Sequence, residues 1–257
     1  MKKILTTENL CFSAGDKELI HKISLEIPKG SFVGLIGPNG CGKSTLLKTI
    51  YRVNRASSGA VYLNGKDIDN WGNREVAKQM AVVTQENDIN FDFTVMEMMK
   101  MGRYAHRKAL GKYNVNDEKI CREALEMVGM QEFEQRSFLT LSGGEKQRVF
   151  IASAFSREAE LIVLDEPTNH LDVGYQFQIM DLMKEQKNIT VFSSIHDMNI
   201  AMKYCDYIIA LKKGKVVSAG TPEEVLTSQM LSNLFRVRAE IQKQKTGQLY
   251  IRYLGAL

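Results

Sequence analysis

The sequence has few cysteines, and none of the four lies close to another. Cys11, Cys41, Cys121 and Cys205 are scattered along 257 residues. Zinc sites and disulfide frameworks need cysteines at close, repeated spacings. The cysteine pattern therefore argues against both and suits a reducing cytosol.

Long apolar runs are also missing. A membrane-spanning helix needs about 20 mostly apolar residues, whereas the longest candidates are VFIASAF at 149–155 and LIVL at 161–164, which are typical of a buried core. Residues 1–10, MKKILTTENL, contain two lysines with no apolar run behind them, which argues against a secretory signal.

The net charge is small for a chain of this size. The 34 Lys and Arg against 30 Asp and Glu give +4, which is compatible with an anionic ligand but leaves no strong nucleic-acid footprint. No nucleic-acid partner is expected. The 44% hydrophobic and 25% charged content is ordinary for a globular protein. We see no internal repeat, and the length fits one large domain or two closely joined ones.

Patterning predicts an α/β fold. Strands are expected at 4–14, 22–27, 31–37 and 79–85, a helix at 43–53, and a hairpin at 59–68 that turns at Asn64-Gly65. Residues 94–160 have mainly helical patterns; Thr94 is expected to cap one helix, and Asn116 or Asp117 the helix that runs through 123–130. Buried strands are expected at 160–167 and 188–196, hairpins at 206–220 and 237–254, and a helix at 221–235 that begins with proline.

Residues 37–44 read GPNGCGKS and form the strongest chemical motif in the first half of the chain. Glycines at 37, 40 and 42 allow a tight turn whose backbone N–H groups surround a phosphate chain at the start of the following helix. Lys43 would reach the β- and γ-phosphates, Ser44 would bind Mg²⁺, and Thr45 would contact the α-phosphate. A chance glycine-rich turn is the alternative, but strand, loop and helix follow one another in the order that nucleotide binding requires.

A magnesium nucleotide also needs carboxylates, and LIVLDE at 161–166 supplies them after a buried strand. Asp165 would hold the Mg²⁺ shell, and Glu166 would accept a proton from the attacking water. An acidic helix cap would account for one of these carboxylates, but not for two in this order behind a phosphate loop.

With these motifs in view, the chain resembles the ATP-binding subunits of ABC transporters over nearly its whole length. GPNGCGKST at 37–45 resembles the Walker A loop of that family, LIVLDEP at 161–167 its Walker B strand, and LSGGEKQR at 141–148 its signature. Gln85 resembles the Q-loop glutamine, residues 169–172 (NHLD) the D-loop, and His196 the H-loop histidine. Phe12 stands where the family has an aromatic residue, more usually tyrosine, that stacks on adenine.

The resemblance implies a head-to-tail dimer that holds two ATP molecules between its subunits. Ser142, Gly143 and Gly144 of one subunit would face the γ-phosphate held by Lys43 of the other, and Asp172 would cross the interface. Gln85 would contact Mg²⁺ or the water that attacks the γ-phosphate, and would sense the membrane partner. His196 would form a hydrogen bond with the γ-phosphate. Taken alone, Gln85, His196 and the HLD sequence each have an ordinary structural interpretation. The residues implied for nucleotide binding are Phe12, Gly37, Pro38, Asn39, Gly40, Cys41, Gly42, Lys43, Ser44, Thr45, Ser142, Gly143, Gly144 and Asp172; those for the reaction are Glu166, His196, Gln85 and Lys43; and those for the metal are Ser44, Gln85 and Asp165.

The implied fold is a phosphate-loop NTPase of the ABC type, with an antiparallel β subdomain and a helical insertion in a single domain over 1–257. Residues 1–85 and 161–222 would form the core, 86–160 the helical subdomain with the signature, and 223–257 a C-terminal helix and hairpin. The implied cofactors are ATP and Mg²⁺. The implied partners are a second copy, integral-membrane permease subunits and, indirectly, a substrate-binding protein. The chain would lie peripherally on the cytoplasmic face of the cell membrane.

Two segments resemble one importer subfamily in particular. MGRYAH at 101–106 is similar to the GRxPH-like segment of subunits that import iron-siderophores, haem or cobalamin, with Ala105 in place of the usual proline. EPTNHLDVGYQ at 166–176 and the end of the chain from FRVRAEI at 235–241 fit the same group. The alternative is an ABC ATPase that does not act in transport, such as an iron–sulfur cluster assembly ATPase of similar length.

The methionines of VMEMMKMGR at 95–103 allow two interpretations. Met96, Met99 and Met101 could line the groove that receives the permease, where adaptable side chains are useful. Alternatively, they fill the core of the helical insertion, which we favour for Met96 and Met99. The segment 86–108 as a whole is the expected contact with the membrane subunit.

Overall fold

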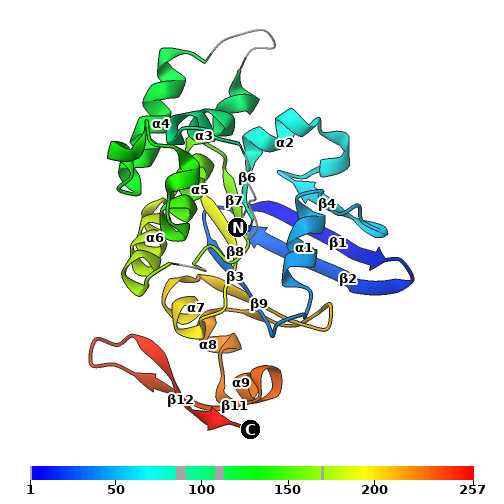
Figure 1. Cartoon of the computed structure of the whole chain (residues 1–257). Coiled ribbons are helices and arrows are strands. Elements are labelled where there is room, and N and C mark those ends of the chain that lie inside the picture. The colour runs from blue at the N-terminus through cyan, green and yellow to red at the C-terminus, as the bar shows by residue number, and fades with distance from the viewer. Residues whose placement is uncertain (1, 85–90, 108–112, 169–170) are drawn as a thin grey trace. The chain divides into compact units, whose positions relative to one another are not determined.

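The computed structural model describes residues 2–84, 91–107, 113–168 and 171–257, which divide into two units (Figure 1). Unit 1 comprises Met1–Asn70 and Thr190–Leu257, and unit 2 comprises Trp71–Ile189. Both contain helices and strands, so the expected α/β class is confirmed. No helix within these described ranges has both the length and the apolar character that a membrane crossing requires.

Unit 1 begins with an antiparallel sheet in the strand order β2-β1-β4-β5. The two long strands pair through alternating buried residues, with Leu5 opposite Ile27. The predicted hairpin at Asn64-Gly65 is confirmed, because both residues have positive φ, of 50° and 76°, as a tight two-residue β-turn requires. The strands are β1 (Lys3–Ala14), β2 (Lys17–Pro28), β4 (Ser58–Leu63) and β5 (Lys66–Asp67), followed by the 3-10 turn η1 (Ile68–Asn70).

The central strands of unit 1 are parallel and fully buried. β3 (Phe32–Ile36) pairs in parallel with β8 (Thr190–Ser194) on one side and with β9 (Tyr207–Lys212) on the other, and β10 (Lys215–Gly220) is antiparallel to β9. Every residue of β3 and β8 is buried, which is typical of parallel strands covered on both faces and explains their unbroken apolar runs. The helices α1 (Lys43–Ile50) and α7 (Met198–Tyr204) follow β3 and β8.

The C-terminal part of unit 1 differs from one expectation. Residues 221–235 form two helices, α8 (Pro222–Val225) and α9 (Ser228–Phe235), and not one. Thr227 has an extended backbone and accepts a hydrogen bond from the Met230 N–H, so a second capping residue starts a new helix inside the predicted one.

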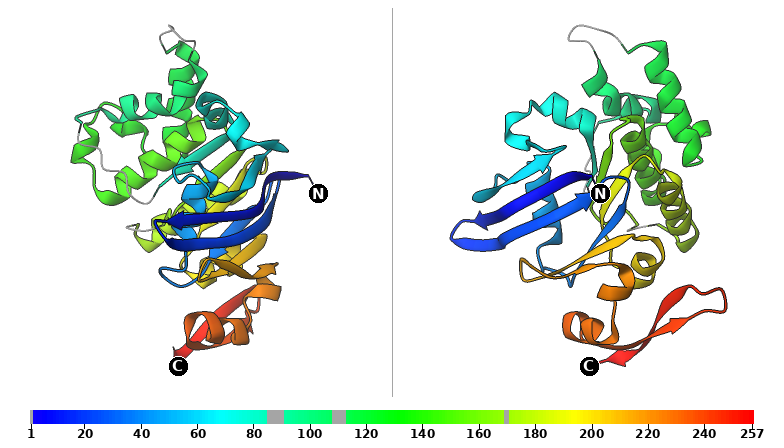
Figure 2. Two further views of the ribbon diagram at one scale, coloured as in Figure 1. Left: turned by 90° about the vertical axis from the view of Figure 1, so that its right-hand side faces the viewer. Right: turned by 180° about the vertical axis from the view of Figure 1, so that it is seen from behind.

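The predicted final hairpin is confirmed as β11 (Val237–Lys243) and β12 (Leu249–Ala256) (Figure 2). Asn199 of α7 holds it by a matched pair of hydrogen bonds. Its side-chain amide donates to the Ile251 carbonyl at 3.2 Å and accepts from the Ile251 N–H at 2.7 Å.

Unit 2 consists mainly of helices around one parallel strand pair, β6 (Met80–Val83) and β7 (Leu161–Leu164) (Figure 1). Thr94 caps α3 as predicted, in a reciprocal capping box with Glu97. The predicted cap at Asn116 or Asp117 is wrong. Asn114 caps α4, and Asp117 is the third residue of that helix, where its carboxylate accepts from the Asn114 N–H. The remaining elements are α2 (Asn73–Gln79), α3 (Val95–Gly102), α4 (Val115–Met127), α5 (Gly143–Ser156), α6 (Val173–Glu185) and the 3-10 turns η2 (Arg103–His106), η3 (Gln131–Phe133) and η4 (Phe138–Thr140).

A buried arginine ties the helices of unit 2 together. Arg103 is 4% exposed; its Nε donates to Asp117 at 3.1 Å, and its Nη1 donates to the Ser156 carbonyl at 2.6 Å and to Glu158 at 2.7 Å. Burial opposes ionisation of Asp117, but the hydrogen bonds from Asn114 and Arg103 and the charge of Arg103 outweigh it and hold the pKa of that carboxyl below its usual value. The segment after α3 is therefore joined to the start of α4 and the end of α5.

Replacing Arg103 with Met should lower the free energy of unfolding by about 3–5 kcal/mol, because it leaves the Asp117 carboxylate buried without its partner. Urea denaturation measures the change. The matched control is Arg122→Met, which breaks half-exposed pairs with Glu118 and Glu134 and should cost at most about 1 kcal/mol. Equal effects of the two substitutions would contradict the structural role of the buried pair.

Candidate active site

The predicted phosphate loop follows β3 in unit 1, and its glycines are required by close backbone packing at Gly37 and by positive φ angles at Gly40 and Gly42. Gly37 has a φ of 156°, and a Cβ atom there would lie 2.3 Å from the Leu211 carbonyl of β9. Gly40 and Gly42 have φ values of 73° and 108°, a region that residues with a side chain rarely adopt. Glycine at these positions therefore lets the loop turn directly against the neighbouring strand.

Lys43 lies inside this loop. The residue is 5% exposed, and its ammonium donates to the Gly37 carbonyl at 2.9 Å and to the Pro38 carbonyl at 3.5 Å. These partners come from the loop itself, so the charge is held where the loop backbone turns. A phosphate oxygen entering the loop could replace either carbonyl and would form a stronger, charge-assisted bond.

The start of α1 offers a second group of donors. Gly42 is its N-cap, with no side-chain cap, and the first turn contains no acidic residue in this described stretch. The first N–H groups of a helix lack partners within the helix and carry partial positive charge, so this end favours an anion. Ser44 and Thr45 follow Lys43 in the first turn of α1.

Gly214, in the turn between β9 and β10, supports the loop from outside. Its N–H donates to the Cys41 carbonyl at 2.8 Å, and its carbonyl accepts from the His21 N–H of β2 at 2.9 Å. Its φ is 70°, and a Cβ there would lie 2.0 Å from the Leu19 carbonyl. The sequence predicted a turn at Gly214 but gave no signal that this turn contacts the phosphate loop, because the contact joins segments about 170 residues apart.

His196 lies at the same edge of the parallel strands as the loop. Leu35 pairs with Ser194, and the Ile195 N–H donates to the Leu35 carbonyl at 3.0 Å, so His196 and Gly37 occupy corresponding positions beyond β8 and β3. The side chain is exposed. Open α/β sheets bind ligands outside the carboxyl ends of their strands, which is where both residues stand.

Phe12 is also in unit 1. It is half-buried near the end of β1, opposite Ile20 of β2, where the strand pairing shifts register on both sides of it. Such irregularities redirect side chains. An aromatic face at the end of this sheet is suited to stacking on a planar base.

Unit 2 holds the two predicted carboxylates at the carboxyl end of β7. Asp165 is 1% exposed, and its N–H donates to the Val83 carbonyl of β6 at 2.9 Å. Glu166 is half-buried and has a φ of 56°, an unfavourable backbone conformation for a residue with a long side chain. Strained backbone of this kind persists where the surroundings hold it, often at functional sites.

Ser142 begins the signature helix α5 in unit 2. Its hydroxyl accepts from the Glu145 N–H at 3.3 Å, and the Glu145 carboxylate accepts from the Ser142 N–H at 2.7 Å. The bond from the Ser142 backbone holds the pKa of Glu145 below its ordinary value. Ser142 and Gly143 are exposed, so the helix start faces outward. Asp172 is the exposed N-cap of α6, with no side-chain cap bond of its own.

Three predicted residues lie outside the described ranges. Gln85 follows β6, and Asn169 and His170 precede Asp172, so their predicted roles remain predictions. Unit 1 contains Phe12, the loop 37–45 and His196, and unit 2 contains Asp165, Glu166, Ser142, Gly143, Gly144 and Asp172.

Ser44 of unit 1 and Asp165 of unit 2 are each of a residue type that can bind magnesium. In the described part of the chain, no three His, Cys, Asp or Glu side chains gather as a metal cage. Mg²⁺ is usually bound through one or two carboxylates together with substrate phosphates and water. The oxygen donors Ser44 and Asp165 are of the type that Mg²⁺ prefers.

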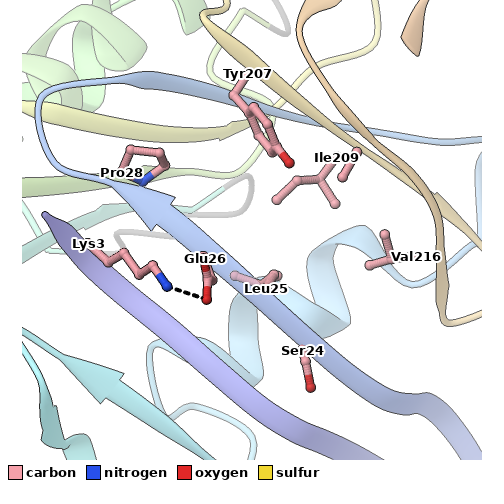
Figure 3. A pocket seen from close by; sticks show the side chains of 9 residues that line it. Lys3, Ser24, Leu25, Glu26, Pro28, Tyr207, Ile209 and Val216 are labelled. Atoms are coloured by element: carbon pink, nitrogen blue, oxygen red, sulfur yellow. Dashed lines mark hydrogen bonds and ion pairs between the residues drawn. The ribbon is translucent and has the colours of Figure 1, made fainter. Parts of the chain in front are cut away.

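A separate hollow of about 470 Å³ lies in unit 1 between β2 and the β9–β10 hairpin (Figure 3). Leu25, Tyr207 and Ile209 line it, and its charged residues Lys3 and Glu26 pair with each other. No set of polar groups converges in it, so it does not have the features of a nucleotide site.

The methionines of α3 fall into two groups, one buried and one exposed. Met96 is 5% exposed and Met99 is fully buried, which confirms the core interpretation for both, whereas Met101 is 43% exposed. In MGRYAH, Arg103 is the buried arginine described above, His106 bonds the Arg157 carbonyl, and Tyr104 is 67% exposed. This segment therefore has an inner face that packs and an outer face that is free of the core.

Comparisons with known proteins agree with this arrangement. A family model described as "ABC transporter" matches residues 20–169. The chain is 43% identical to the iron(3+)-hydroxamate import ATP-binding protein FhuC of Bacillus subtilis over 92% of this chain and 89% of the relative. It is 35% identical to the ferric enterobactin transport ATP-binding protein FepC of Escherichia coli, over the same shares of the two chains.

Among solved structures, the chain is similar to one described as an inward-facing metal-chelate type ABC transporter. The match has a TM-score of 0.85 at 27% identity and covers all of this chain and 98% of the other. The similarity thus includes the C-terminal hairpin as well as the phosphate loop.

Gly214→Ala should weaken binding of a fluorescent ATP analogue by about tenfold, because the turn must move away from Leu19 and release the Cys41 carbonyl. The control is Gly15→Ala, at a hairpin glycine of similar φ with no atom near its missing side chain. It should cost about 1–2 kcal/mol of stability through strain alone and leave affinity unchanged. Unchanged affinity in Gly214→Ala would show that the turn does not support the loop.

Proposed function

This chain belongs to the ABC transporter family, and from that premise we propose that it is the ATP-hydrolysing subunit of an importer for ferric siderophores. The carrying observation is its similarity, over about nine-tenths of both chains, to ATP-binding proteins for import of iron(3+)-hydroxamate and ferric enterobactin. The transported complex would contact a permease and a binding protein. This chain would supply the free energy of ATP binding and hydrolysis that drives transport.

For nucleotide binding, we assign the phosphate chain to the loop 37–45 and the adenine to Phe12. Lys43 would exchange its bonds to the Gly37 and Pro38 carbonyls for bonds to the β- and γ-phosphate oxygens. The N–H groups at the start of α1 would complete the anion site. Ser44, Asp165 and Gln85 would hold Mg²⁺. When bound, this ion would neutralise negative charge on the phosphate oxygens.

For hydrolysis, Glu166 is the proposed base. Its carboxylate would accept a proton from a water whose oxygen attacks the γ-phosphorus, while the bond to the β-phosphate oxygen breaks and ADP leaves. His196, beyond β8 in the same unit as the loop, would donate a hydrogen bond to a γ-phosphate oxygen and align it.

The site would be completed by a second copy. Ser142 and Gly143 are exposed at the start of α5, where helix N–H groups favour negative charge. We assign this surface, with Gly144, to the γ-phosphate bound by the loop of the partner subunit, and Asp172 to the interface. Each chain would then contribute half of two sites.

The permease contact is assigned to the outer face of the segment 86–108. Phe91, Met101 and Tyr104 are 71%, 43% and 67% exposed, while Arg103 anchors the segment from below. Exposed apolar side chains on a firmly anchored turn suit docking of an amphipathic segment from a membrane subunit.

Glu166→Gln should bind ATP, form a stable dimer on size-exclusion chromatography and hydrolyse ATP at least about 100-fold more slowly, because it lacks the base. Ser142→Arg should retain ATP binding by the single chain but lose the ATP-dependent dimer, also when combined with Glu166→Gln. Wild-type turnover in Glu166→Gln would remove that residue as the base. A normal dimer in Ser142→Arg would reject the composite site.

Deleting the gene should abolish uptake of radiolabelled ferric hydroxamate or ferric enterobactin by whole cells, and the wild-type chain, but not Lys43→Ala, should restore it. Pull-down should recover integral-membrane subunits. Unchanged uptake of every ferric siderophore tested, together with reduced activity of iron–sulfur enzymes, would favour the cluster-assembly alternative.

A further inference from the structure

Two glutamine side chains donate to backbone carbonyls of Pro167, Thr168 and Leu171, which lie between Glu166 and Asp172 in the sequence. The Gln147 amide of α5 donates to the Pro167 carbonyl at 3.0 Å. The Gln176 amide of α6 donates to the Thr168 carbonyl at 3.2 Å and to the Leu171 carbonyl at 3.0 Å. We call Gln147 and Gln176 the glutamine clamp. Both residues lie outside the nucleotide-binding and catalytic sets assigned above.

The clamp donates to carbonyls that lie beyond Leu164, where β7 ends. Pro167 and Leu171 are buried, and buried carbonyls need a hydrogen-bond donor. The Thr168 carbonyl also accepts from the Leu171 N–H at 3.3 Å. A primary amide has two N–H donors, and Gln176 directs its amide to two carbonyls. The positive φ of Glu166 is therefore flanked by backbone that side chains hold in place.

Each clamp residue is on the same helix as a residue assigned to the dimer interface. Gln147 follows Ser142 by five residues on α5, and Gln176 follows Asp172 by four on α6, where its N–H donates to the Asp172 carbonyl at 3.0 Å. The two helices also meet directly, because the Arg148 guanidinium lies 4.3 Å from the centre of the Tyr175 ring. The backbone beside Glu166 is thus connected to α5 and α6 by direct hydrogen bonds, and the two helices contact each other.

We propose that Gln147 and Gln176 are positioning residues that make the placement of Glu166 depend on the position of the signature helix. This proposal rests on the proposed function, in which Ser142 docks on nucleotide held by a second copy. When α5 docks there, the clamp sets the orientation of the base that serves the chain's own nucleotide. One site would then report its occupancy to the other as a coupling between sites.

The test uses the full chain with Gln147→Met and Gln176→Met, which keep side-chain length and remove the amide. Gln178→Met, at an exposed position of α6, is the matched control. We expect kcat to fall roughly 10- to 100-fold in each clamp variant, as small misplacements of reacting groups do. The Hill coefficient for ATP should fall toward 1, while KM and binding of a fluorescent ATP analogue stay at wild-type values and Tm falls by only a few degrees, about the loss expected for one or two buried hydrogen bonds. The double variant should be little slower than either single variant, because both act on one segment.

Gln147→Glu provides a readout that a purely structural role would not produce. Its carboxylate cannot donate to the Pro167 carbonyl, whereas the protonated acid can. Facing a carbonyl oxygen raises the pKa of the new carboxyl from about 4.3. Activity relative to wild type should therefore rise as the pH is lowered toward the raised pKa of this carboxyl and its protonated form accumulates.

Wild-type kcat in Gln147→Met, or a loss of kcat that parallels a loss of Tm and nucleotide affinity, would overturn the proposal. The proposal would also be overturned if the wild-type Hill coefficient is above 1 and both substitutions leave it unchanged. A wild-type chain that forms no ATP-dependent dimer would instead show that the composite site has failed, and the coupling between sites with it.

Discussion

Backbone packed directly against backbone is the constraint on which the nucleotide half of this protein depends. Gly37 turns against the Leu211 carbonyl with no room for a side chain, and Gly214 holds the Cys41 carbonyl from the opposite hairpin. These contacts bind the loop to β9 and β2, whose own positions follow from the buried parallel strands. The loop backbone is therefore held in place by unit 1 itself, and Lys43 is held by the loop carbonyls.

Local patterns predicted most of the fold. Buried apolar runs identified β3, β7 and β8, and glycine turns identified the hairpins, because both features act between residues near in sequence. The cap of α4 and the break between α8 and α9 were missed, since several adjacent polar residues could cap and only their backbone geometry chooses among them. No expectation covered α2, α6 or α7. In α6, the exposed Val173, Tyr175 and Phe177 hide the helical period that its three buried residues carry.

The candidate site was predicted as a set of motifs, and the structure adds the groups that support them. Lys43, Asp165 and Ser142 stand at the strand ends and helix starts where their motifs require. The supporting contacts of Gly214, Gln147 and Gln176 could not be read from the sequence, because each is made to a backbone carbonyl, whether that carbonyl lies far along the chain or only five to eight residues away. Every residue has a backbone carbonyl, so the sequence does not indicate which side chain donates a hydrogen bond to a given carbonyl. Only the folded structure shows it.

The turn at Arg103 has a buried side that stabilises the helices and an exposed side that is free to vary. The arginine and its carboxylate partners carry the stability of the turn, whereas Met101 and Tyr104 on its outer face carry almost none. Substitutions on that face can accumulate without unfolding the helices beneath. In the proposed permease contact, a lineage of such chains would change the membrane subunit it serves by altering a few exposed side chains, and would keep the helices beneath unchanged.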